Sequence, residues 1–201
     1  MIVYGAGQNK PFSIRDLRIE NLNYFCIKLN QMKKHSGMRP HDIVVLLKIA
    51  SKGNTPWLMK DLASELAISA GEISESLHRS AHAGLIRGDK KQILASSLIE
   101  FLQCGLKYVF PVHCGSVVRG MPTAYSAAPL NADIQSGDMV VWPFAEGTIR
   151  GQAITPLYPG VPKACLHDKS LYELLTLTDA LRIGKARERT LAVKELKRRL
   201  L

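Results

Sequence analysis

The distribution of proline is the feature that most narrowly limits what this chain can fold into. Seven of the ten prolines lie between residues 111 and 163, with many glycines and alanines between them. Proline lacks a backbone N–H and its ring clashes with the preceding helical turn, so this stretch cannot form one helix. Two apolar runs within it, DMVVWPF and TIRGQAI, are typical of short strands. We therefore expect an irregular segment with a small β element.

The chain before this segment has the periodicity of helices. Apolar residues recur at helical spacing in 40–52, where Pro40 suits the first turn and Gly53 can end the helix. The run LMKDLASEL predicts a second helix, and residues 70–82 predict a third. Ser69 can cap this third helix. The turn between the second and third helices is short, which is typical of a helix-turn-helix.

Two further features surround the third predicted helix. Ser69 and Glu72 have the spacing of a capping box, in which each side chain bonds the other residue's backbone N–H. After Gly84, the run LIRGDKKQIL reads as apolar, basic turn, apolar, which predicts a two-stranded hairpin at about 87–92. Such a hairpin would serve as a wing beside the helix pair.

The chain after residue 94 is helical at both of its ends. The apolar pattern from Ser96 to Val109 predicts a helix that stops before Pro111. Two more helices are expected from Asp168 onward, separated at Gly184. The last one has a basic flank, which we interpret as a solvated face around a seam for a partner helix, with DNA contact as a secondary role.

Composition limits the partners and the compartment. The net charge is +10 and 46% of residues are apolar, which together favour a folded protein with an acidic partner such as nucleic acid. No run of about 18 apolar residues is present, so we expect no membrane span. The N-terminus lacks a signal pattern, and the four cysteines are scattered without a C-x-x-C pair. These features predict a cytoplasmic protein with reduced thiols.

The segment LASELAISAGEISESLHRSAHAGLI resembles the winged helix-turn-helix of bacterial transcriptional regulators of the MarR-like kind. The matching residues are Leu62, Ala63, Leu66, Ile68, Ser69, Ile73, Ser74, Leu77, Arg79, Ala83, Gly84, Leu85 and Ile86. The resemblance covers roughly residues 39–94. It implies that the helix at about 70–82 docks in the major groove of DNA and that the hairpin lies on the DNA backbone. Residues 111–201 depart from the helical dimerisation arms of that family.

The DNA-binding candidates come from the third helix and from the hairpin. By resemblance, the groove-facing set is Ser69, Ala70, Gly71, Glu72, Ser74, Glu75, His78 and Arg79. The hairpin adds Arg87, Lys90 and Lys91, whose cations can contact phosphate.

Several of these candidates have a second interpretation. Glu72 fits a helix cap better than a base contact. Glu75 either selects cytosine or repels non-specific DNA. Arg79 is a phosphate contact or a solvated surface residue. His78 and His82 are spaced for a metal but have no third ligand in the sequence.

Enzymatic and metal sites have little support in the sequence. No P-loop, G-x-S-x-G, H-E-x-x-H or Rossmann fingerprint is present. The adjacent pair His113 and Cys114 would point in opposite directions on an extended chain. Together with Cys165 and His167, they do not have zinc-finger spacing. We therefore predict a protein that is not an enzyme and has no metal or cofactor.

The sequence thus predicts a mainly α fold with a small β wing, of the α+β class. We expect an N-terminal arm at 1–38, a winged helix-turn-helix at 39–94, and a partner or dimerisation region at 95–201. The predicted function is sequence-specific regulation of transcription by a homodimer on double-stranded DNA. The alternative is an antitoxin-like or adaptor protein whose residues 111–201 bind another protein.

Overall fold

The computed structural model describes residues 37–134 and 137–201, and Gly37–Leu201 form one compact unit. Nearly all of the expected arm at 1–38 lies outside the described residues. The helices are α2 (Pro40–Ser51), α3 (Met59–Leu66), α4 (Ala70–His82), α5 (Ala95–Glu100), α6 (Leu106–Val109), α7 (Val161–Cys165), α8 (Lys169–Ile183) and α9 (Ala186–Leu200). The strands are β1 (Val117–Pro122), β2 (Val140–Pro143) and β3 (Ile149–Ala153). This mixed helical architecture with a small sheet confirms the predicted class in its coarse form.

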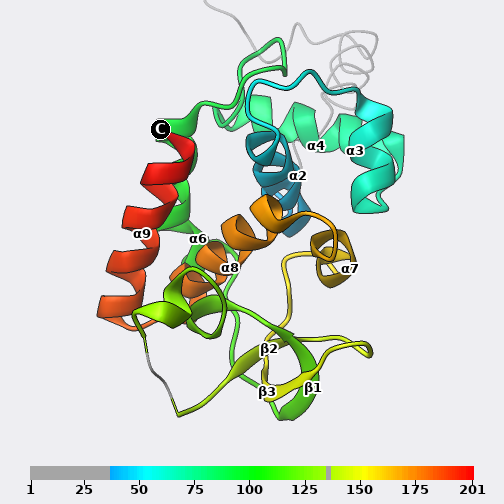
Figure 1. Ribbon diagram of the computed structural model, residues 1–201. Coiled ribbons are helices and arrows are strands. Elements are labelled where there is room, and N and C mark those ends of the chain that lie inside the picture. Colours follow the sequence, from blue (N-terminus) through cyan, green and yellow to red (C-terminus); the bar gives the residue numbers. More distant parts are fainter. Residues whose placement is uncertain (1–36, 135–136) are drawn as a thin grey trace, which may run out of the picture. The chain divides into compact units, whose positions relative to one another are not determined.

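Helix α2 is the centre of the helical part. Its residues from Ile43 to Leu47 are fully buried, as expected of a helix that is apolar on all sides. It packs against α3, α4 and α8, and Figure 1 shows it between α4 and α8. One apolar core runs from α2 into α8 and α9. The expected boundary at residue 94 therefore does not separate two cores.

A buried lysine of α2 links three helices. Lys48 Nζ lies 2.6 Å from a carboxylate oxygen of Glu65 in α3 and 2.6 Å from one of Asp168. Asp168 also caps α8, because it accepts a hydrogen bond from the backbone N–H of Leu171 at 2.8 Å. Burial opposes ionisation of both carboxyls, but their hydrogen bonds outweigh it and lower the pKa of each.

The helix predicted at 96–109 contains a π-helical turn at Phe101–Gly105. Leu98, Leu102 and Leu106 are all buried, whereas a regular α-helix would spread these three positions over roughly 80° of its circumference. The wider turn keeps these leucines on one face, and Gly105 leaves room for the ring of Phe101. Val109, the last residue of the predicted helix, is exposed.

The three strands form a closed sheet in which each strand pairs with the other two. Strand β1 is antiparallel to β2 and to β3, while β2 and β3 run parallel. Both predicted strands are confirmed, but β1 and α7 were not expected because glycine and proline mask them in the sequence. Gly120 lies where β1 meets β2, and a Cβ there would come within 2.1 Å of the Trp142 carbonyl oxygen. This contact makes glycine necessary for strand pairing.

A buried carboxylate attaches the sheet to α8. Asp179 accepts hydrogen bonds from the Trp142 indole N–H at 2.5 Å and the Thr123 hydroxyl at 3.0 Å. Its other oxygen pairs with Arg182 at 2.8 Å. Arg182 also donates to the backbone carbonyl of Phe110, which precedes β1 along the chain. A single pair of side chains on α8 therefore holds the sheet and its connections in place.

We expect Gly120→Ala to destabilise the fold by at least about 2 kcal/mol, because the added methyl group overlaps the backbone of β2. Gly115→Ala, just before β1, is the matched control, since its Cβ would meet only ordinary contacts, the nearest at 3.5 Å. Urea unfolding measures both variants. Equal stability of the two would contradict this account of the sheet.

We expect Lys48→Met to cost most stability near neutral pH and progressively less as the pH falls. The lowered pKa values of Glu65 and Asp168 stabilise the fold above their ordinary values of 4.5 and 3.8, and this stabilisation is lost on protonation. Denaturant unfolding between pH 3 and pH 7 measures the difference from the parent protein. A matched Lys60→Met variant on the exposed side of α3 should show a difference that does not change across that range.

Candidate nucleic-acid interface

The helix pair α3 and α4 is joined by a tight turn. Helix α3 ends at Ala67, which has a left-handed conformation with φ of 52°. Ser69 then caps α4, because its hydroxyl accepts from the backbone N–H of Glu72 at 3.2 Å. The two helices share an apolar core. Its buried members are Leu62, Leu66, Ile68, Ile73 and Leu77.

One side of α4 faces away from this core. Most of the predicted groove-facing set is on it: Ser69, Ala70, Gly71, Glu75 and His78 are exposed and Ser74 is half-buried. The side chains at the start of the helix are the smallest of this set. A flat surface or a groove wall could therefore approach the backbone of α4 closely at its N-terminal end.

The side chain of Arg79 is buried and not displayed with this set, which corrects its expected role as a phosphate contact. Only 6% of its side chain is exposed, and it forms a two-pronged pair with the fully buried Asp42, at 2.7 and 2.8 Å. Asp42 also accepts from the backbone N–H of Arg39 at the start of α2. The guanidinium is thus committed to holding α4 against α2. A charged residue inside the apolar run of 40–52 was the signal for this pair.

Glu72 is also directed inward rather than toward a base. The Arg79 guanidinium at 2.7 Å, together with His41 at 2.8 Å, lowers the pKa of this carboxyl. Half of the predicted capping box is therefore present. The Ser69 hydroxyl accepts from the Glu72 backbone N–H, but the Glu72 carboxylate binds Arg79 and not the backbone of Ser69. Glu75 remains the exposed acid of the predicted set.

The hairpin after α4 is shorter than expected. Ile86 and Ile93 form a single antiparallel bridge, and the Arg87 N–H donates to the Gln92 carbonyl at 2.8 Å. Lys90 has a left-handed conformation with φ of 59° that closes the turn. Asp89 stabilises it by accepting from the backbone N–H of Lys91 at 2.9 Å.

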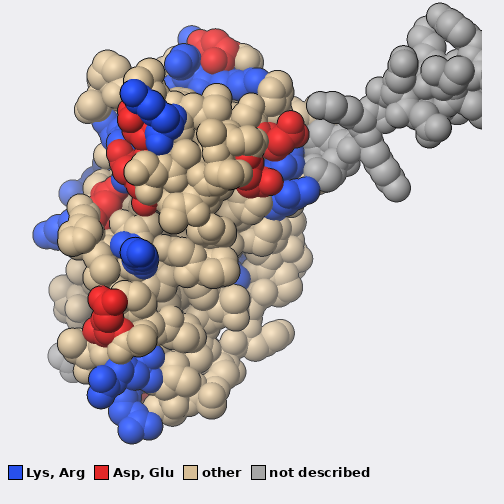
Figure 2. All heavy atoms as spheres, turned by 90° about the vertical axis from the view of Figure 1, so that its right-hand side faces the viewer, with Lys and Arg blue, Asp and Glu red and all other residues tan. Residues whose placement is uncertain are grey.

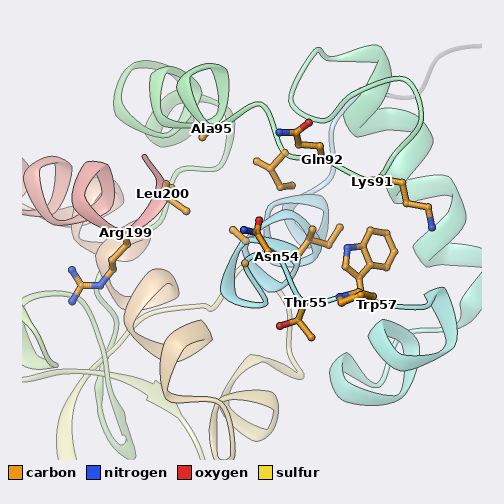
Figure 3. A pocket seen from close by; sticks show the side chains of 13 residues that line it. Asn54, Thr55, Trp57, Lys91, Gln92, Ala95, Arg199 and Leu200 are labelled. Carbon is orange, nitrogen blue, oxygen red and sulfur yellow. The ribbon is translucent and has the colours of Figure 1, made fainter.

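The hairpin places its cations next to α4 and next to a cavity. Lys90 Nζ is 2.8 Å from His78 Nε2, so the hairpin and the exposed side of α4 meet there. Lys91 Nζ lies 5.2 Å from the ring centre of Trp57, a cation–π contact. Figure 3 shows Lys91 and Trp57 at one end of a cavity of about 560 Å³, with Arg199 of α9 at the other. Arg87 is exposed.

The other predicted positions are spread over the molecule. His113, Cys114 and His167 are exposed, whereas Cys165 is buried and its pKa is raised to about 12 by that burial. Within 37–134 and 137–201, no three His, Cys, Asp or Glu side chains are grouped as metal ligands. No helix in the described part of the chain has the length and apolar character needed to cross a membrane. Comparisons with protein-family models, with curated proteins and with solved structures found no match to this chain.

Replacing Arg79 tests the corrected role directly. Arg79→Met should lower the free energy of unfolding by about 3–5 kcal/mol, because it leaves the buried Asp42 carboxylate without its partner. Arg87→Met, at an exposed position in the hairpin, should change it by less than about 0.5 kcal/mol. Chemical denaturation of both variants gives the comparison, and a mild effect of Arg79→Met would contradict the buried pair.

Proposed function

We propose that residues 39–94 act as a winged helix-turn-helix that binds double-stranded DNA in a transcriptional regulator. The observation that carries this proposal is the contact between His78 and Lys90, which joins the exposed side of α4 to the cationic hairpin. A helix and a neighbouring basic turn on one surface can engage a groove and its flanking phosphates together. The resemblance of the segment from Leu62 to Ile86 supports the same interpretation.

Helix α4 would enter the major groove with its N-terminal end leading. Ser69, Ala70 and Gly71 are small enough to bring the backbone close to DNA, and the positive end of the helix dipole favours phosphate. Ser74 and Glu75 follow on the same side of the helix. Their side chains offer hydrogen-bonding groups to base edges, and a glutamate can accept from the N4 amino group of cytosine.

The hairpin would supply the backbone contacts. Arg87, Lys90 and Lys91 lie within one turn and carry three positive charges. Lys90 is steadied by His78, and Lys91 by the ring of Trp57. Since Arg79 is engaged with Asp42, these three residues replace it as the source of affinity for phosphate.

Two copies of the chain would bind the two halves of a palindromic site. One module of this kind covers a single half-site in the major groove, and pairing of copies supplies the second. The apolar side of α9, which includes Ala192 and Leu196, is buried within this chain, so the partner seam expected on this helix is filled by the chain itself and pairing would need another surface. Analytical ultracentrifugation of the protein bound to a duplex that carries its site measures the mass of the complex. We expect this mass to correspond to two chains on one duplex.

Neutralising the hairpin should weaken binding and flatten its salt dependence. The variant that combines Arg87→Gln, Lys90→Gln and Lys91→Gln loses three phosphate contacts in each chain. The slope of log K against log salt should therefore fall by roughly 2.7 for each bound chain. A triple variant on α9, with Lys185, Lys194 and Lys197 changed to Gln, removes the same charge elsewhere. Fluorescence anisotropy with duplex DNA measures both. An unchanged slope in the hairpin variant would contradict the proposal.

Glu75→Gln should change base preference at one position of the site by roughly tenfold, or else strengthen binding to non-specific DNA. A changed base preference would mean that Glu75 contacts a base, and stronger non-specific binding would mean that its charge repels DNA. Selection of binding sites from random duplexes with both proteins makes the measurement. Glu100→Gln, at an exposed position on α5, is the matched control and should leave the selected sequence unaltered.

A further inference from the structure

Two arginines lie directly opposite each other on the outer face of the sheet. The register of β1 and β3 pairs Arg119 with Arg150, and both side chains are exposed. Opposite residues of an antiparallel pair have Cβ atoms roughly 5 Å apart on the same face. Like charges at that spacing repel each other, so this arrangement weakens the sheet unless an anion is bound.

No carboxylate of the described chain relieves this repulsion. Neither Arg119 nor Arg150 forms an ion pair or a side-chain hydrogen bond with residues in 37–134 or 137–201. By contrast, Arg79, Arg182 and Arg199 all pair with carboxylates. Figure 2 shows a group of Lys and Arg side chains at the lower end of the face in view, at the height where Figure 1 has the sheet.

The backbone keeps the two arginines in register. Each is followed by a glycine that faces inward, and a Cβ on Gly120 or Gly151 would come within 2.1 or 2.5 Å of the carbonyl oxygen of Trp142 or Met139. A slip of one residue would bring larger side chains to those inward positions. The strands therefore cannot slide to separate the arginines, and the pair of positive charges is a fixed feature of the fold.

We propose that Arg119 and Arg150 together bind one phosphate group. A carboxylate has two oxygens, which one guanidinium group can already occupy with two parallel N–H donors. A phosphate group has more oxygens and can accept from both guanidinium groups at once. The charge of a phosphate group also offsets the repulsion between the two side chains. Inorganic phosphate and the backbone of a nucleic acid are the two sources of such a group, and the experiments below distinguish them. This site shares no residue with α4 or the hairpin, so it stands apart from the proposed function.

The first experiment measures thermal unfolding with inorganic phosphate against chloride at constant ionic strength. The parent protein should be stabilised by phosphate, and Arg119→Gln with Arg150→Gln should lower the apparent phosphate affinity at least tenfold. In chloride this double variant should melt no lower than the parent, since it has lost the repulsion. Lys185→Gln with Lys194→Gln, two exposed changes on α9, controls for general salt effects and should respond as the parent does.

A second variant distinguishes the contribution of the planar guanidinium donors from that of the positive charge. Arg119→Lys with Arg150→Lys keeps both charges and their repulsion but removes the planar donors, so its phosphate affinity should also fall. A lysine variant that binds phosphate as the parent does would overturn the proposed geometry.

Duplex DNA provides the other source of phosphate. If the site contacts a nucleic-acid backbone, the Gln double variant lowers the salt slope of DNA binding by roughly 0.9 for each bound chain, because one phosphate contact is lost. If it binds free phosphate, only the thermal response changes and DNA binding does not. The effect of the hairpin variant on DNA binding tests the proposed function and does not test this site. The proposal is overturned if neither response depends on Arg119 and Arg150.

Discussion

The buried pair of Arg79 and Asp42 is the interaction on which the exposed side of α4 depends. Two charges are removed from water there, which is favourable only because the guanidinium and the carboxylate meet through two short hydrogen bonds. Asp42 simultaneously holds the first turn of α2, so one carboxylate fixes the start of one helix and the rotation of another. That rotation decides which residues of α4 face outward, and therefore which of them a partner can reach.

Helical periodicity was a good guide to the elements of this region and a poor guide to the roles of its charged residues. The bounds of α2, α3 and α4 follow the apolar spacing, the caps and the glycines. Arg79 differs because its partner Asp42 lies 37 positions earlier in the sequence, and the Glu72 carboxylate in turn pairs with the buried Arg79. A pattern within one helix cannot reveal that a charge on another helix will be buried against it.

The sheet shows a different limit of sequence reasoning. Strand β1 was hidden because its inward position at Gly120 has no side chain, so the alternation of apolar and polar residues that marks a strand is absent. Trp142 and Thr123 both donate hydrogen bonds to Asp179, which lies 37 and 56 positions later in the sequence, so no local pattern indicates these contacts. The strands at 140–143 and 149–153 were predictable because their apolar residues are local and consecutive.

The closure of this sheet also limits how the chain can associate with others. Within the described part of the chain each strand has a partner strand on either side, so the sheet has no outer strand to which another polypeptide could add. Growth of the sheet by strand addition, the usual route from small β elements to aggregates, is therefore blocked. Any molecule that recognises this part of the protein must do so through its side chains, which makes the recognition specific to the residues displayed there.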